Sequence, residues 1–131
     1  MTSEHLIEWA EHYLRARDSF ERKMISLAKT KTGLDVKYKT RELLVLCQNA
    51  LDVKTVPATG HVLLVVTQSK SNFDALIEGF KSLAHNPDLT VAFANTKTTE
   101  KWLVKPHVHV NVADPVSLKK GLQSLYDAVA V

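Results

Sequence analysis

The feature that most constrains the fold is an unbroken apolar segment, residues 62–66, followed by a helical pattern and a second strand-like segment. The absence of polar alternation in this segment is typical of a strand buried on both faces of a sheet. Residues 89–94 form the second strand-like segment, so we expect a strand–helix–strand unit with parallel strands. Ser71 and Asp74 are a predicted capping box, and the apolar face of the helix consists of Phe73, Leu76, Ile77, Phe80, Leu83 and Ala84.

The C-terminal part of the chain continues this pattern. Residues 102–104 predict a further strand, antiparallel to the previous one and ended by Pro106. The valines of residues 108–112 alternate with polar residues, which predicts one more strand. Asp114 and Pro115 then provide an N-cap and a proline at the first helical position. The expected inward side of this last helix carries Leu118, Leu122, Leu125, Tyr126 and Val129.

The N-terminal segment predicts one long amphipathic helix from Ser3, its expected N-cap, to about Lys29. Its apolar residues recur every three or four positions. At 1.5 Å per residue, a helix of about 27 residues is roughly 40 Å long, which is more than a small sheet can cover. We therefore expect one end to project or to pair with a second copy, and the expected contacts of such a homodimer are Leu6, Tyr13 and Phe20.

Residues 34–48, between the N-terminal helical segment and the apolar segment of residues 62–66, are predicted to form two strands. In the first, Val36, Tyr38 and Thr40 alternate with Lys37, Lys39 and Arg41, which predicts one apolar face and one cationic face. Residues 43–47 are short and apolar, as in a strand at the centre of a sheet. Residues 49–60 are expected to connect this strand to the next, because Pro57 and Gly60 interrupt regular structure.

These elements predict a single α/β domain over residues 1–131, with a mixed sheet of about five strands, the long N-terminal helix and two further helices. A chain of 131 residues with 45% apolar and 24% charged residues is typical of a globular domain with one core. No apolar run is longer than five residues, and the N-terminus has no basic region before an apolar stretch. We therefore expect a cytoplasmic protein without a membrane span. Cys47 is the single cysteine, and we expect it to be a buried apolar residue in a reducing compartment.

The net charge of +3 is distributed unevenly. Nine basic residues and three acidic residues lie between Arg15 and Arg41. The expected cationic strand face of Lys37, Lys39 and Arg41 could follow the phosphates of a nucleic acid, and such binding would weaken steeply with salt. The alternative is a solvated surface that prevents the sheet edge from pairing with other chains.

The order of the expected elements suggests a family. The expected order is a helix, two strands, an apolar strand that ends in Gln68-Ser69-Lys70, a helix and a strand. Over residues 3–95 this order resembles the core of the restriction-endonuclease-like, PD-(D/E)XK nucleases. This resemblance implies a site for Mg²⁺ or Mn²⁺ in which Asp52 and the position of Gln68 hold the metal and Lys70 assists the nucleophile. Because glutamine brings no charge to the acidic position, the resemblance implies weak metal binding and equally a non-catalytic member of the family.

A second metal site is suggested by His107 and His109, which would point the same way from a strand and could share one ion. The alternative is a pair of surface histidines opposite an apolar face. The sequence thus predicts a nucleic-acid-associated or interaction module of nuclease-like fold without robust catalysis, whose phosphate contacts are Lys37, Lys39, Arg41 and Lys70. A metal-dependent nuclease that uses Asp52, Gln68 and Lys70 and a homo-oligomeric structural protein are the alternatives.

Overall fold

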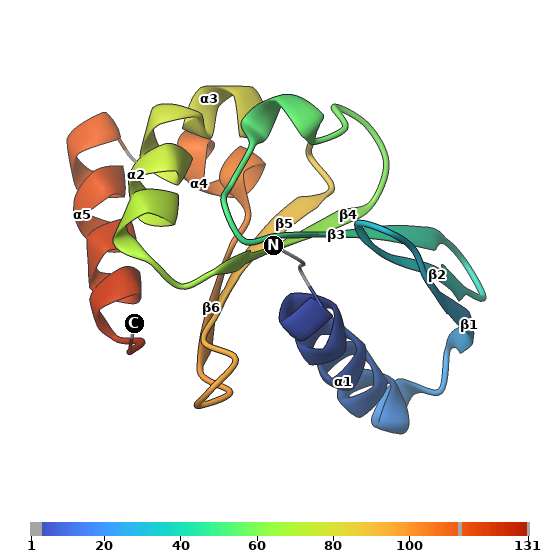
Figure 1. Ribbon diagram of the computed structural model, residues 1–131. Coiled ribbons are helices and arrows are strands. Elements are labelled where there is room, and N and C mark those ends of the chain that lie inside the picture. The colour runs from blue at the N-terminus through green and yellow to red at the C-terminus, as the bar shows by residue number, and fades with distance from the viewer. Residues whose placement is uncertain (1–3, 113, 131) are drawn as a thin grey trace.

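A six-stranded mixed sheet lies between two helical layers (Figure 1). The computed structural model describes residues 4–112 and 114–130. The strands are β1 (Met24–Lys29), β2 (Gly33–Tyr38), β3 (Glu42–Gln48), β4 (Val62–Thr67), β5 (Leu89–Ala94) and β6 (Lys101–Val104). The helices are α1 (Glu4–Glu21), α2 (Lys70–Glu78), α3 (Phe80–Leu83), α4 (Pro106–Val112) and α5 (Pro115–Asp127), with a short 3₁₀ helix η1 (Val53–Thr55). The predicted α/β class is confirmed.

The six strands follow one another across the sheet in chain order. The first three form an antiparallel meander, β3, β4 and β5 are parallel, and β6 is antiparallel to β5. The parallel pairing of β4 and β5 through helices and the two strands expected in residues 34–48 are confirmed. The sheet has one strand more than the roughly five that were predicted.

The additional strand is β1, which occupies the second part of the predicted N-terminal helix. The helix ends at Glu21 because the Asp18 carboxylate accepts hydrogen bonds from the backbone amides of Lys23 and Met24 at 2.8 and 2.9 Å. Arg22 adopts a left-handed backbone conformation (φ 50°), which turns the chain into β1. A bulge at residues 24–26 of β1 leaves Met24 and Leu27 both half-buried, so their three-residue spacing imitates a helix. The predicted cap, Ser3, lies outside the described residues.

Two apolar cores lie on the two faces of the sheet. On one face, α1 packs Leu6, Ile7, Ala10 and Leu14 against apolar residues of β2 to β5. On the other face, a larger core joins the sheet to α2, α3 and α5. Apolar burial on both faces explains why β4 consists of consecutive apolar residues.

The predicted dimer contacts do not form one exposed surface. Leu6 is only 1% exposed and packs in the core, whereas Phe20 is 93% exposed and Tyr13 is half-buried. The prediction of a docking face made from these three residues is therefore wrong, because Leu6 is unavailable to a second copy.

The helices after β4 differ in detail from the sequence expectation. The N-cap of α2 is Ser69, whose hydroxyl accepts a hydrogen bond from the amide of Asn72 at 3.2 Å, so the predicted box at Ser71 and Asp74 is wrong. Gly79 separates α2 from α3. The Asp114 cap of α5 is confirmed by bonds from the amides of Val116 and Ser117.

Residues 106–112 form helix α4, not the strand that alternating valines predicted. Pro106 begins the helix, where its fixed φ and missing N–H are favourable. The amide of His109 donates to the carbonyl of Lys105 at 3.0 Å, and α4 packs on α3 and β5. Tertiary packing thus overrides the strand preference of the valines.

The single thiol lies in the core beneath α1. Cys47 is 3% exposed, as predicted, and burial raises the pKa of its thiol to about 12. The thiol is therefore protonated at neutral pH and is a poor nucleophile.

Candidate functional site

Gln68, which was predicted to hold a metal, instead connects β4 to the C-terminal segment. Its side chain is 3% exposed. The amide nitrogen donates to the carbonyls of Tyr126 and Val129 at 2.9 and 3.0 Å, and the amide oxygen accepts a bond from the Trp102 indole at 2.8 Å. The prediction of a metal-binding Gln68 is wrong, because these bonds hold its amide in a buried structural contact.

Asp52 and Lys70 also have local structural partners. Asp52 caps η1, where its carboxylate accepts a bond from the amide of Lys54 at 3.1 Å. The Lys70 ammonium is 2.8 Å from the Asp74 carboxylate, which raises the pKa of the lysine. The strand before Lys70 is the fourth in chain order, whereas the nuclease comparison required the third.

Asn72, on α2, joins the connection that carries Asp52 to the end of β4. Its amide oxygen accepts a bond from the amide of Leu51 at 2.9 Å. Its amide nitrogen donates to the carbonyls of Asn49 and Thr67 at 2.9 and 2.8 Å. Across residues 4–112 and 114–130, no group of three or more His, Cys, Asp or Glu side chains is placed to hold a metal. The described residues therefore do not assemble the Mg²⁺ or Mn²⁺ site that the resemblance implied.

The histidine pair does not form the expected strand site either. His107 and His109 lie two residues apart on α4, and with about 3.6 residues per turn their side chains diverge. The Nδ1 atom of His107 is 2.9 Å from the carbonyl of Ala84, and that of His109 is 2.9 Å from the carbonyl of Lys105. The prediction that both point to one metal ion is wrong.

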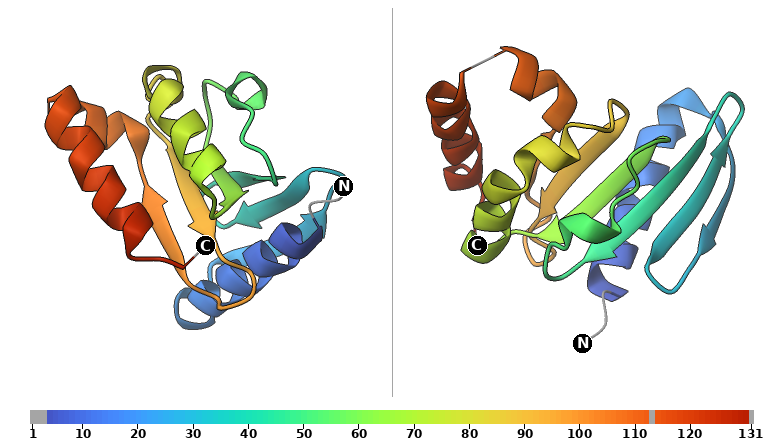
Figure 2. Two further views of the ribbon diagram at one scale, coloured as in Figure 1. Left: turned by 60° about the vertical axis from the view of Figure 1, so that its left-hand side comes forward. Right: turned by 90° about the horizontal axis from the view of Figure 1, so that it is seen from above.

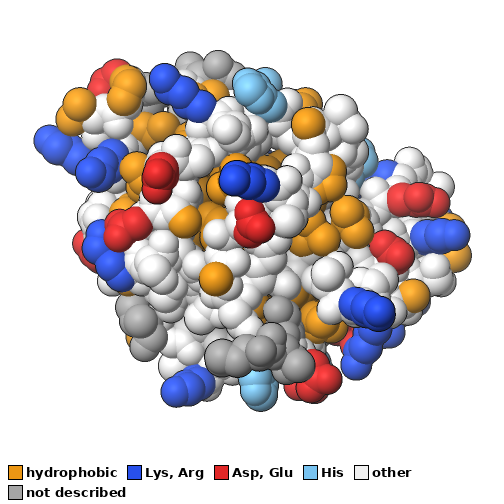
Figure 3. All heavy atoms as spheres, turned by 45° about the horizontal axis from the view of Figure 1, so that its top comes forward, with side chains coloured by type: hydrophobic (Ala, Val, Ile, Leu, Met, Phe, Trp, Pro, Cys, Tyr) orange, Lys and Arg blue, Asp and Glu red, His pale blue; other side chains and the backbone are white. Residues whose placement is uncertain are grey.

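The four predicted phosphate-binding cations lie on different parts of the surface. Lys37 is exposed on β2, on the face opposite the buried Val36. The strand ends at Tyr38, so Lys39 lies in the turn to β3 and Arg41 follows it. Lys70 lies at the other end of the sheet, after β4. The expected single cationic face is therefore wrong, because the chain turns before the alternation is complete. Figure 3, which looks toward the layer of α2, α3 and α5, shows basic and acidic side chains interspersed.

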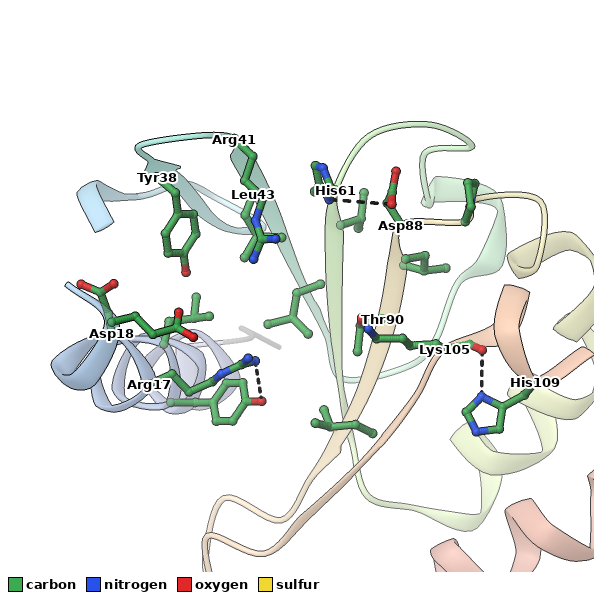
Figure 4. A pocket seen from close by; sticks show the side chains of 18 residues that line it. Arg17, Asp18, Tyr38, Arg41, Leu43, His61, Asp88, Thr90, Lys105 and His109 are labelled. Carbon is green, nitrogen blue, oxygen red and sulfur yellow. Dashed lines mark hydrogen bonds and ion pairs between the residues drawn. The ribbon is translucent and has the colours of Figure 1, made fainter. Parts of the chain in front are cut away.

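Arg41 contributes instead to a groove between α1 and the sheet (Figure 4). The groove has a volume of about 580 Å³ and opens at the end of the sheet where β4 and β5 begin. Its lining includes Tyr13 and Arg17 of α1, Tyr38 and Arg41 near the β2–β3 turn, and Leu103 and Lys105 in and just after β6.

The groove exists because α1 covers only part of its side of the sheet. The helix packs mainly on β2, β3 and β4, whereas β6 lies at the far side of the sheet (Figure 2). The α1-side residue of β5 at this end is Thr90, which is small. Leu103 of β6 is paired with Ala92 and is partly exposed. Because Thr90 is small, a hollow remains between α1 and β6 at this end of the sheet.

Three cations from separate elements converge on this hollow. Arg17, Arg41 and Lys105 point into it from α1, from the residue after the β2–β3 turn and from the residue after β6 (Figure 4). Arg17 donates to the Tyr13 hydroxyl at 3.2 Å, and the Arg41 guanidinium carbon is 5.4 Å from the Tyr38 ring centre. None of the three forms an ion pair within the part of the chain that the structure describes.

The lining also carries three carboxylates, Asp18, Glu21 and Asp88, so its formal charge is zero when its histidines are neutral. Asp18 is bonded to the two backbone amides that follow α1. Asp88 lies 4.0 Å from the imidazole of His61, and Glu21 is exposed at the end of α1. Burial raises the pKa of the Tyr38 phenol, so the hydroxyl stays protonated at neutral pH and can donate a hydrogen bond. The groove thus offers cationic and neutral donors to an anionic ligand.

The comparisons with known proteins found no counterpart of this chain. No protein-family model matches it, and neither a search of curated proteins nor a search of solved structures finds a similar one. The resemblance to restriction-endonuclease-like nucleases stays a prediction. No helix in residues 4–112 and 114–130 combines the length and apolar character needed to cross a membrane.

Proposed function

We propose that the groove binds the phosphate backbone of a nucleic acid and that the protein is a nucleic-acid-binding module. The observation that carries this proposal is the convergence of Arg17, Arg41 and Lys105, three exposed cations without ion-pair partners among the described residues. An arginine guanidinium can donate two parallel hydrogen bonds to the oxygens of one phosphate, and a lysine ammonium attracts the phosphate as a single positive charge. Cations on opposite walls favour a ligand that carries several phosphates.

The charge distribution supports a polyanionic ligand. The segment from Arg15 to Arg41 carries nine basic and three acidic residues. Of these, Arg17, Arg41, Asp18 and Glu21 line the groove, so the basic surplus of the segment lies outside the lining itself. Each phosphate that is neutralised releases condensed counterions, so affinity should depend on salt. We propose that this binding takes place in the cytoplasm and without robust catalysis. The structural partners of Asp52, Gln68 and Lys70, the residues of the predicted nuclease site, support the second point.

Removing a positive charge from the groove should weaken binding and its salt dependence, whereas removing a negative charge should strengthen binding. We expect Arg17→Gln, Arg41→Gln and Lys105→Gln each to reduce the slope of log K against log salt by about 0.7–0.9, the contribution of one phosphate contact. Glu21→Gln removes a negative charge from the lining and should strengthen binding at low salt. Fluorescence anisotropy of a labelled oligonucleotide, titrated between about 50 and 200 mM salt, measures these slopes.

Lys119→Gln is the matched control, because Lys119 is exposed on α5, on the opposite side of the sheet. It should leave both affinity and slope close to those of the unchanged protein. If Lys119→Gln reduces the slope as much as Arg17→Gln does, binding follows net charge alone and the proposed groove is not the site.

A further inference from the structure

We infer that the groove takes single-stranded rather than duplex nucleic acid, with bases stacked on Tyr13 and Trp9. This inference rests on the proposed function and adds the class of nucleic acid. It is carried by the arrangement of aromatic and cationic side chains along α1 and β6.

A row of planar side chains follows α1 from the groove. Trp9, Tyr13 and Arg17 are spaced by four residues, so they lie on one face of the helix. The Trp9 and Tyr13 rings are nearly parallel, with an angle of 11° between their planes and 5.2 Å between their centres. Both residues are only half-buried. The Arg17 guanidinium carbon lies over the Tyr13 ring, 5.6 Å from its centre. An incoming base would therefore stack on the accessible side of Trp9 or replace the Arg17 guanidinium on Tyr13.

A second line of cations faces this row from β6. Lys101 is paired with Ala94, whose side chain lies in the core beneath α1, so Lys101 is on the same side of the sheet. Its ammonium is 5.3 Å from the centre of the Tyr13 ring. Lys105 lines the groove further along the chain. A strand of nucleic acid in this position would have cations on both sides and aromatic rings along one wall.

This alternation of rings and cations suits unpaired bases. Aromatic side chains bind single strands by stacking on exposed bases, while nearby cations bind the backbone. In a duplex the bases are already stacked on one another and would have to be flipped out to reach Tyr13. The volume of about 580 Å³ is also in the range, about 300–1,000 Å³, of sites that enclose small ligands. A nucleotide fits this range, whereas a duplex would remain outside the groove.

The test compares three oligonucleotides of equal phosphate number at one salt concentration: oligothymidine, its abasic counterpart and a hairpin duplex. We expect oligothymidine to bind about tenfold more tightly than either of the others, which is within the range measured for base–aromatic stacking. It should also quench tryptophan fluorescence. Trp9→Phe should abolish this quenching, because the other tryptophan, Trp102, is buried at 5% exposure.

Tyr13 variants separate stacking from charge. Tyr13→Ala should remove a large part of the preference for oligothymidine over the abasic strand, whereas Tyr13→Phe, which keeps the ring and loses only the hydroxyl bonded to Arg17, should retain that preference. Thermal unfolding of both variants verifies that they are folded, and the comparison of oligonucleotides on the unchanged protein needs no variant.

The outcomes distinguish this inference from the proposed function. If the abasic strand or the duplex binds as tightly as oligothymidine, and Arg17→Gln still weakens binding, the inference is overturned and the proposed function stands. If no oligonucleotide binds at low salt, both fail. If thymidine monophosphate competes as well as the full oligonucleotide, the site takes a small phosphate ligand and both are again overturned.

Discussion

Replacing Gln68 with leucine is expected to lower the free energy of unfolding by about 3 kcal/mol. Leucine has a similar size, so the loss comes from hydrogen bonds and not from a cavity. The Trp102 indole N–H and the carbonyls of Tyr126 and Val129 would lose their bonds to Gln68. A buried polar group without a partner costs about 1–3 kcal/mol. Urea denaturation followed by circular dichroism measures the change.

Gln123→Leu on α5 is the control for this prediction. Gln123 also forms a hydrogen bond, to the carboxylate of Asp127 at 2.9 Å, but that bond is exposed. We expect a change within about 0.5 kcal/mol, which is usual for surface substitutions. A loss below about 1 kcal/mol for Gln68→Leu would contradict the structural role of Gln68 and restore it as a candidate for metal binding.

The second large effect is expected when Arg17→Gln, Arg41→Gln and Lys105→Gln are combined. At about 50 mM salt we expect an affinity a few hundredfold below that of the unchanged protein, because three phosphate contacts each contribute a slope of about 0.7 or more in log K against log salt. The remaining salt dependence should be small. The anisotropy titration used for the single variants measures both quantities.

A second triple variant makes the same change of net charge elsewhere. Lys70→Gln, Lys119→Gln and Lys120→Gln replace three exposed lysines of α2 and α5, away from the groove. We expect their combination to bind within about threefold of the unchanged protein, since distant surface charges are largely screened. An equal loss in both triple variants would show that overall charge, and not the groove, determines affinity.

The central part of the fold could be predicted because its local signals agree. Strand β4 is apolar at every position up to Thr67 because helices cover both faces of the sheet there. The helical pattern of α2 follows from burial of one of its faces. The alternation of β5 places Leu89, Val91 and Phe93 in one core and the small Ala92 and Ala94 in the other. Asp114 and Pro115 marked the start of α5 because capping is a local property of the chain.

The secondary structure was predicted wrongly where one spacing of apolar residues fits both a helix and a strand. Met24 and Leu27 are spaced as in a helix, but a bulge allows the same spacing in β1. The valines of residues 108–112 alternate as in a strand, but Pro106 and packing on α3 favour a helix. In both cases the choice depends on contacts with distant segments, which the spacing of residues does not reveal.

The candidate site could not be predicted for a related reason. Arg17 and Arg41 were recognised as part of a basic segment, but nothing in the sequence indicated that Lys105 joins them from the opposite wall. Conversely, Gln68 resembled a catalytic position because it is polar at the end of a strand. The structure shows four buried polar side chains among the described residues, all of them amides bonded to the backbone of other segments: Gln68, Asn72, Asn86 and Asn95.

The position of bound nucleic acid is tested most directly by an NMR titration that follows backbone amides and arginine side chains as an oligonucleotide is added. We predict shifts at Arg17, Tyr38, Arg41, Leu103 and Lys105, with Lys119 unchanged. Shifts centred on Asp52 and Lys70, at the opposite end of the sheet, would contradict the groove as the binding site.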